Sequence, residues 1–344
     1  MRKLNTIARA LCGGMLAALI ATSAAHAQAW LVIDLPGFNG GTLVPGPISG
    51  DNTMIGFYSK SDGTNPSYIR TSDGTLTAFS VDGSSYTSAE GINAYDDIVG
   101  TYDAGGNENG FLRTASGQVT TFSVGASPYT QGTCINDSGT IGGEYTDPST
   151  YLNIGFVRAA DGTVKTFASP DGRQILVNAI NNKGETAGTY GNNGYNHGFI
   201  RGFAGKITTF DIPNAQSVIV VSLNGAGVVA GYYNDTNRTA HGFIRQADGT
   251  ITTFDEPNAL ITYDGTEVSG MNDNGILVGT YHDNSGQHGY ARSANGTYVT
   301  LDAPLAARGT QIWSVGPNGK MMGQYTDASG TRHLFRANAA LTGF

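Results

Sequence analysis

Seven side chains in this sequence have the chemistry of a binding site for a sugar or another small polar ligand. They are Trp313, Tyr86, Tyr129, Glu90, Glu267, Arg173 and Arg308. Trp313 stands out because it breaks a repeat, at a position where other units have Glu90, Thr133, Asn178, Val221 or Ser269. Aromatic rings flanked by carboxylate and guanidinium groups are suited to stacking on and hydrogen-bonding a sugar ring. The alternative is that Trp313 only fills space where the fold closes.

Catalytic signatures are absent from the sequence. It contains no Gly-x-Ser-x-Gly nucleophile motif and no His-Glu-x-x-His zinc motif. Glycoside hydrolysis requires two opposed carboxylates, but Glu90 and Glu267 fall in the second and sixth repeat units, which a seven-membered ring does not set side by side. A polysaccharide lyase would need a tyrosine, histidine or arginine to take and return a proton. Whether such groups converge stays open at this stage.

Asp and His recur in register in four of the units. Asp147, Asp235, Asp283 and Asp327 each lie two residues after a repeated tyrosine, and a later strand opens with His197, His241, His288 or His333. None of these residues has the spacing of a calcium loop. We therefore expect structural roles, with the aspartate capping a turn and the histidine bonding a neighbouring loop. His282, beside Asp283, is the one unrepeated histidine and a weak metal candidate.

No cofactor is expected. Residues 225–230 match the Gly-x-Gly-x-x-Ala dinucleotide pattern, but the sequence that follows is a strand rather than the helix that would hold a pyrophosphate. Cys134 falls at a position that is small in the other five of units two to seven, so we expect it to be packed rather than reactive.

The first 27 residues have the layout of a secretory signal peptide, with basic residues, an apolar run and the ending Ala25-His26-Ala27. Cleavage after Ala27 would leave residues 28–344 as one domain, secreted or periplasmic, with Cys134 as its single cysteine. The mature chain would carry 16 basic and 27 acidic residues, a net charge of −11. Nucleic acid and anionic membranes are therefore not expected as partners, because both require a basic face. We expect a monomer.

A glycine followed two residues later by a tyrosine recurs seven times, at intervals near 45 residues. The pairs are Gly56/Tyr58, Gly100/Tyr102, Gly143/Tyr145, Gly188/Tyr190, Gly231/Tyr233, Gly279/Tyr281 and Gly323/Tyr325. Each unit also contains three other short β-type segments bounded by Gly, Asn or Asp, which is typical of strands and tight turns. The period and the four strands per unit predict an all-β fold, a seven-bladed β-propeller of four-stranded antiparallel blades.

The two ends of the chain predict how the ring closes. The sequence stops soon after residues 333–336, where a Thr-Phe-Asp strand is due, whereas residues 32–36 form an unpartnered copy of that strand. We expect this N-terminal strand to complete the seventh blade and to remove an exposed sheet edge. The strand that ends in Ile-Asn would then be innermost. The loops from second to third strand and between blades would form the face where ligands bind.

The motifs at residues 196–201, 240–245 and 287–292, with their Thr-Thr-Phe-Asp and Ile-Asn-x-x-Gly partners, resemble the bacterial extracellular HAF repeat family. The likeness covers essentially the whole mature chain. It implies export and a propeller-like fold, and it implies no active site.

These observations favour a non-catalytic binding module for an extracellular glycan, a small ligand or a protein partner. An alternative is a carbohydrate-active enzyme, a polysaccharide lyase or glycoside hydrolase, with its site at the top of the propeller channel. A third is a purely structural repeat of the cell surface.

Overall fold

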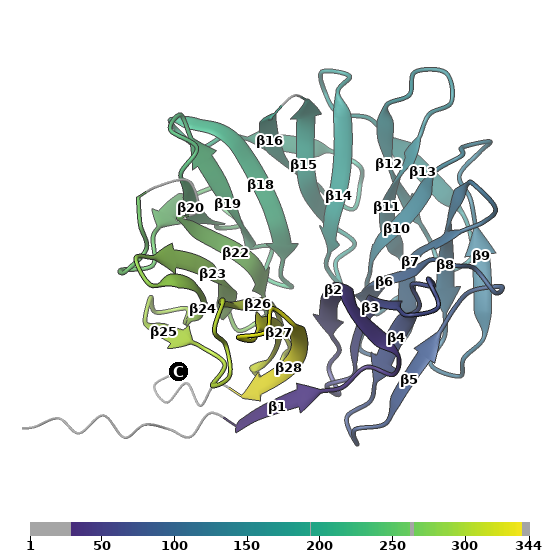
Figure 1. Cartoon of the computed structure of the whole chain (residues 1–344). Coiled ribbons are helices and arrows are strands. Elements are labelled where there is room, and N and C mark those ends of the chain that lie inside the picture. The colour runs from purple at the N-terminus through teal and green to yellow at the C-terminus, as the bar shows by residue number, and fades with distance from the viewer. Residues whose placement is uncertain (1–28, 193, 262–264, 339–344) are drawn as a thin grey trace, which may run out of the picture.

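The computed structural model describes residues 29–192, 194–261 and 265–338, which form seven four-stranded antiparallel sheets. The sheets are arranged around a central axis like the blades of a propeller (Figure 1). The predicted seven-bladed β-propeller is therefore confirmed. Within these residues no helix has the length and apolar character needed to cross a membrane. The predicted signal peptide, residues 1–27, lies outside the described residues.

Each blade runs from an inner strand beside the axis to an outer strand at the rim. Blades one to three consist of β2 (Phe38–Ile48), β3 (Met54–Lys60), β4 (Ser67–Arg70) and β5 (Leu76–Phe79); β6 (Thr87–Ile92), β7 (Ile98–Asp103), β8 (Glu108–Arg113) and β9 (Val119–Phe122); and β10 (Thr130–Ile135), β11 (Ile141–Thr146), β12 (Asn153–Arg158) and β13 (Val164–Phe167). Blades four to six consist of β14 (Gln174–Ile180), β15 (Thr186–Asn192), β16 (Tyr195–Arg201) and β17 (Ile207–Phe210); β18 (Ala215–Leu223), β19 (Val229–Asp235), β20 (Ala240–Arg245) and β21 (Ile251–Phe254); and β22 (Thr266–Met271), β23 (Leu277–Asp283), β24 (Gly286–Arg292) and β25 (Tyr298–Leu301). Blade seven consists of β26 (Thr310–Val315), β27 (Lys320–Thr326), β28 (Arg332–Asn338) and β1 (Ala29–Ile33).

Blade seven closes the ring as predicted, because β1 pairs antiparallel with β28. Val32 lies opposite Phe335, and the ring of Trp30 packs on Phe335 with centroids 4.7 Å apart. Figure 1 shows the purple first strand beside the yellow last one. β1 ends at Ile33, whereas the sequence predicted a strand that continues to Pro36. It stops at Ile33 because the chain then turns, with the Phe38 N–H donating to the Leu35 carbonyl.

The Gly-x-Tyr repeat is explained by crowding in the middle of each blade. A Cβ on Gly100 would lie 1.9 Å from the carbonyl oxygen of Ser88 and 2.8 Å from the ring of Phe111. Equivalent clashes would occur at Gly143 and Gly188. The second strand therefore needs a glycine wherever the third-strand aromatic ring crosses it, and this requirement links the Gly-x-Tyr motif to the Gly-Phe motif.

Neighbouring blades pack through one repeated aromatic contact. The third-strand arginine of each of five blades lies over the outer-strand phenylalanine ring of the preceding blade, at 4.7–5.3 Å: Arg113 on Phe79, Arg158 on Phe122, Arg201 on Phe167, Arg245 on Phe210 and Arg292 on Phe254. Each such cation–π contact contributes about 0.5–1 kcal/mol. The Thr-Phe-Asp and Gly-Phe-x-Arg motifs thus hold adjacent blades together.

The asparagine of the Ile-Asn motif lies in the turn between the first and second strands and joins neighbouring blades there. The Asn136 side-chain oxygen accepts from the backbone N–H groups of Ser138 and Thr140, and its amide donates to the Asn181 carbonyl of the next blade at 3.0 Å. The same donation joins Asn93 to Asn136, Asn181 to Asn224, and Asn272 to Gly316. One side chain therefore shapes a turn and ties two sheets.

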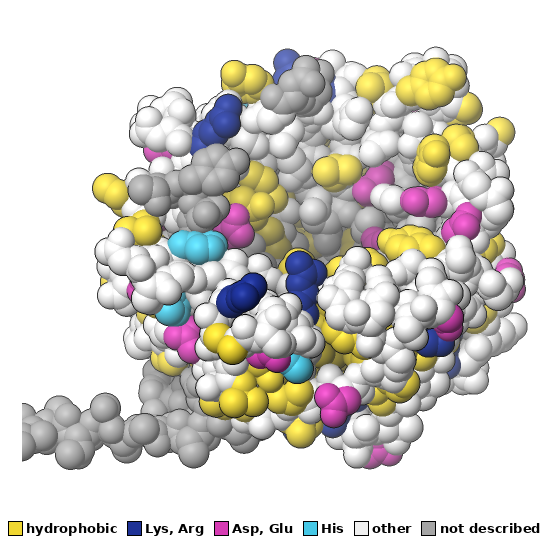
Figure 2. Space-filling model, viewed as in Figure 1, with side chains coloured by type: hydrophobic (Ala, Val, Ile, Leu, Met, Phe, Trp, Pro, Cys, Tyr) yellow, Lys and Arg dark blue, Asp and Glu magenta, His cyan; other side chains and the backbone are white. Residues whose placement is uncertain are grey.

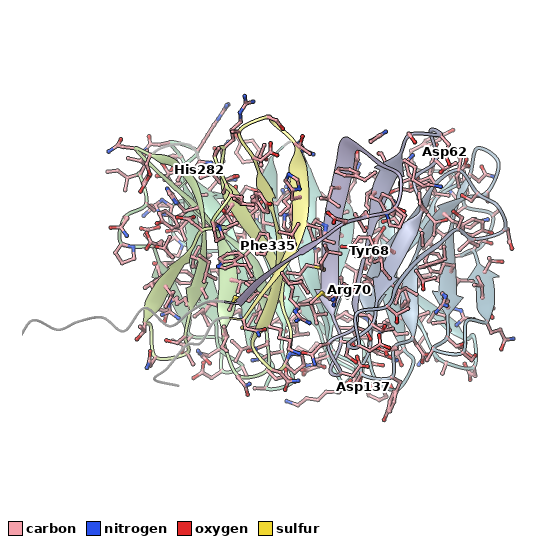
Figure 3. All side chains as sticks on the ribbon, turned by 60° about the horizontal axis from the view of Figure 1, so that its bottom comes forward. Asp62, Tyr68, Arg70, Asp137, His282 and Phe335 are labelled. Carbon is pink, nitrogen blue, oxygen red and sulfur yellow. The ribbon has the colours of Figure 1, made fainter. Side chains whose placement is uncertain are left out.

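The two faces of the propeller differ in their loops. Figure 3 shows Asp137, from a first-to-second-strand turn, at one end of the blades, and Asp62 and His282, near second-to-third-strand turns, at the other. We call the first end the bottom face and the second the top face. Tyr68 and Phe335 lie between them, where blades one and seven meet, and the Tyr68 hydroxyl contacts the Met322 sulfur at 3.6 Å.

Candidate binding cavity in the channel

Every inner strand carries a β-bulge that leaves unpaired residues beside the channel. In blade two, Ala89 pairs with Gly100 and Gly91 with Val99, so Glu90 between them has no partner. The single unpaired residues of the following blades are Thr133, Asn178, Val221, Ser269 and Trp313. A bulge re-aims the side chain of its extra residue. All six of these residues line the central cavity.

This cavity has a volume of about 660 Å³, within the range of small-molecule sites. All seven inner strands contribute to its wall, and Figure 2, which looks onto the top face, shows a hollow at the centre of the ring. Trp313 lines this cavity and is 37% exposed. Tyr86 also lines the cavity and packs edge-on against Phe57 at 5.6 Å.

Three of the seven predicted ligand residues therefore come together: Trp313, Glu90 and Tyr86 line the cavity. Burial in the channel raises the pKa of Glu90 to about 7, against the opposing effect of the Ser88 and Thr101 hydroxyls; the charge of Glu108 adds to the rise. A carboxyl group with this pKa exchanges its proton near neutral pH.

A second carboxyl group, Glu144, was missed by the sequence analysis. It lies on β11, is only 6% exposed, and its Oε2 accepts from the Val177 N–H of the next blade at 3.1 Å. Burial raises its pKa to about 8, the Val177 N–H opposes this, and the charge of Glu90 adds to it. The two carboxyl groups therefore interact electrostatically, although they belong to different blades.

A signal for Glu144 was present in the sequence. It is the middle residue of a Gly-x-Tyr motif, and the other six units have Phe57, Thr101, Thr189, Tyr232, Thr280 and Gln324 at that place. Glu144 is thus the one acidic residue in the series. It also lines a smaller hollow of about 130 Å³, which it shares with the predicted Tyr129.

The remaining predicted ligand residues lie outside the central cavity. Glu267 is exposed on β22, where its charge adds to the effect of burial in raising the pKa of Tyr232. Arg173 forms an ion pair with Asp171 at 3.0 Å. Arg308, in the loop before β26, lies over Gly330. The structure thus does not gather the predicted guanidinium groups around Trp313.

Cys134 is buried as expected, with 8% exposure. Burial is also the main reason that its pKa rises to about 12. The thiolate that nucleophilic chemistry needs is therefore scarce at neutral pH.

The repeated Asp and His residues form structural clamps on the top face. His288 Nδ1 lies 2.9 Å from Asp302, its Nε2 lies 3.0 Å from Asp283, and its ring stacks on Tyr281. Asp283 also accepts from the Ser285 N–H and so caps its turn. Related pairs are His197 with Asp211, His241 with Asp255 and His333 with Asp327, each His stacked on the repeated tyrosine of its blade. The expected turn-capping and bridging roles are confirmed.

A metal site at His282 gains no support from this geometry. In the described ranges no three His, Cys, Asp or Glu side chains come close enough together to hold a metal ion. Asp283, the neighbouring candidate, is engaged by His288 and Ser285. The His282 backbone itself is fixed, because its carbonyl accepts from the Leu260 N–H at 2.8 Å.

Comparisons with known proteins support the fold alone. Virginiamycin B lyase from Staphylococcus aureus superimposes with a TM-score of 0.61 at 12% identity, covering 90% of this chain and 99% of the lyase. A streptogramin B lyase gives 0.59 at 14% identity, covering 90% and 98%. TolB from Acinetobacter baumannii gives 0.51 at 12% identity, covering 73% and 63%. No protein-family model matches the chain. No curated protein matches it either.

Proposed function

We propose that this protein is an exported, non-catalytic β-propeller of the HAF repeat type that binds a small extracellular ligand in its channel, such as part of a glycan. The observation that carries the proposal is the half-exposed indole of Trp313 in a cavity of about 660 Å³. A large aromatic side chain left accessible in a concave site is a typical platform for a ligand ring. Export to the periplasm or the medium rests on the predicted signal peptide.

The scaffold favours binding over catalysis for a chemical reason. The thiol of Cys134 in the cavity wall is poorly activated for nucleophilic attack, because burial raises its pKa. The rest of the wall consists mainly of small, apolar and amide side chains from the seven inner strands. Such a wall can exclude water and shape a ligand without reacting with it.

The test is ligand binding by the purified mature chain, residues 28–344, on a glycan array, followed by titration calorimetry of the hits. Trp313→Ala should weaken binding at least about tenfold, because it removes the ring on which the ligand stacks. Its melting temperature should stay that of the wild type. Trp30→Phe is the matched control, since Trp30 packs on Phe335 in the outer strands of blade seven, and it should bind normally. Unchanged binding by Trp313→Ala would overturn the proposal.

One observation favours a carbohydrate-active enzyme as the second candidate. Glu90 in the central cavity and Glu144 in the smaller hollow interact electrostatically, and burial raises their pKa values to about 7 and 8, so one can be protonated while the other is ionised. An acid and a base of this kind are what glycoside cleavage requires. A polysaccharide depolymerisation screen decides between the two. Activity that disappears in both Glu90→Gln and Glu144→Gln would establish the enzyme.

A further inference from the structure

The charged groups of the central cavity are all acidic. Its wall contains the carboxyl groups of Glu90 and Asp273 and, among the described residues, no Lys, Arg or His. Asp273 lies toward the bottom face, where its Oδ1 already accepts from the Gly225 N–H at 2.7 Å. Glu90, on its bulge, interacts electrostatically with Tyr86, one of the aromatic residues of the wall.

The ionisable groups around Glu90 add no positive charge to the site. The groups that interact with it electrostatically are Glu108 on β8, Glu144 on β11, Cys134 on β10 and Tyr86 before β6. All four are acids, and burial raises the pKa values of the Cys134 thiol and the Tyr86 hydroxyl, so these two are uncharged at neutral pH. The nearby Ser88 and Thr101 are neutral. A cleft of one sign of charge with low-dielectric walls attracts ligands of the opposite sign.

Aromatic side chains complete the chemistry of the wall. Trp313, Tyr86 and Phe57 all line the cavity, and the indole of Trp313 is accessible. Ring faces attract cations, and tryptophan attracts them most strongly; aromatic cages use this to recognise ammonium groups. A carboxylate together with aromatic rings is therefore better suited to a small organic cation than to an anion or a bare sugar.

We propose that the ligand of this cavity carries a positively charged ammonium group, which the Glu90 carboxylate neutralises and the rings of Trp313 and Tyr86 contact. The inference rests on the proposed ligand-binding function and narrows its ligand class. It also gives binding a defined pH dependence. Because the pKa of Glu90 is about 7, a cation must displace its proton in acid, so affinity rises as the pH rises through neutrality.

Choline and its uncharged isostere 3,3-dimethylbutan-1-ol are the probes, because they share one shape and differ in charge, and choline does not titrate. Calorimetry is carried out at about pH 5.5 and about pH 8.5. We expect choline to bind at least about tenfold more tightly at the higher pH, and the alcohol to bind weakly and equally at both. Trp30→Phe allows Trp313 fluorescence to report occupancy of the cavity directly.

Glu90→Gln should abolish both the preference for choline and its pH dependence. Glu267→Gln is the matched control, because Glu267 is also an inner-strand glutamate but lies outside the cavity, and it should retain both properties. A thermal melt of each variant at both pH values confirms that the fold persists. If Glu90→Gln fails to fold, Glu90→Asp replaces it and should keep the pH dependence.

Two results would overturn the cation inference. One is equal affinity for choline and the alcohol at about pH 8.5, and the other is no choline binding at about 50 mM. If array ligands still bind in a Trp313-dependent way, the proposed function survives that failure. If Trp313→Ala changes no binding at all, the proposed function fails as well.

Discussion

Blades one to three and blades four to seven share one scaffold but use the top face differently. Opposite the repeated tyrosine, blades four to seven have His197, His241, His288 and His333, each paired with a carboxylate. At the same register, blades two and three have Asn109 and Ile154, and the Tyr58 N–H of blade one bonds to Pro66. Glu90, Glu108 and Glu144 all belong to blades two and three.

The two parts of the ring therefore place their acidic side chains differently. In blades four to seven the polar groups of the top face satisfy one another, because each histidine bonds an aspartate. In blades two and three, Glu90 lines the channel and Glu144 is buried against the next blade, and burial raises the pKa of both. A buried carboxyl group has a free-energy cost when it ionises. A ligand of suitable charge can offset that cost.

Glu144→Gln should have the largest effect on this contrast, and its sign depends on pH. The pKa of Glu144 is raised from 4.5 to about 8, so the cost of its burial is absent below about pH 4.5 and complete above about pH 8. The glutamine can still accept from the Val177 N–H. We expect wild-type stability at about pH 4 and about 2–4 kcal/mol greater stability at about pH 9, measured by urea unfolding. If wild type and Glu144→Gln have the same stability at both pH values, ionisation of the buried Glu144 carboxyl group does not destabilise the fold.

The next test compares the asparagine bonds that join neighbouring blades on the bottom face, one in blades one to three and one in blades four to seven. Asn136→Ala and Asn272→Ala each remove two bonds accepted from backbone N–H groups of the turn and one bond donated to the next blade. Asn136→Ala also removes a bond accepted from the Ser138 hydroxyl. Both should lower the free energy of unfolding by about 2–3 kcal/mol, within about 1 kcal/mol of each other. Chemical denaturation measures both. A clearly larger loss for either variant would mean that the halves differ in scaffold as well as in the top face.

His288→Gln should have the smallest effect, confined to the clamped half. Burial alone would lower the pKa of His288, but the carboxylates of Asp302 and Asp283 outweigh it and raise that pKa. The clamp therefore stabilises fully below about pH 6.5 and loses its contribution as the pH rises through the raised value; at the acid end, the pKa of Asp283 is about 2. The variant should melt a few degrees lower at about pH 5.5 and closer to wild type at about pH 9.

The control for His288→Gln is Asn109→Ala, which alters the same register position in blade two without a clamp. Its melting temperature should change little and in the same way at both pH values. A pH-independent loss in His288→Gln would show that stacking on Tyr281, rather than charge, is the stabilising contact.

The ring could be predicted from the sequence because its constraints repeat. Gly100 and its equivalents are fixed by contact with an aromatic ring, and the unpartnered segment near Val32 indicates the closure. The turn-capping role of Asp283 was likewise visible from its register. These features depend on short-range geometry that every blade reproduces.

The site was harder to predict because it depends on how blades face each other. Nothing in the spacing around Glu144 reveals that its side chain bonds to Val177 of the next blade. Arg173 and Glu267 break the repeat as Trp313 does, yet of these three only Trp313 lies on a bulge and lines the cavity. Residues that break the repeat therefore pointed to inner strands, but they did not show which side chains line the cavity.

The pairing of β1 with β28 also affects how the protein folds. Ala29 lies opposite Asn338, so two segments that are far apart in the sequence must meet before blade seven is complete. Contacts this distant in sequence form slowly, because a long loop must close first. Until then β28 presents an open edge to other chains. Before β1 pairs with β28, the protein is therefore prone to edge-to-edge aggregation, which binding by a chaperone would prevent.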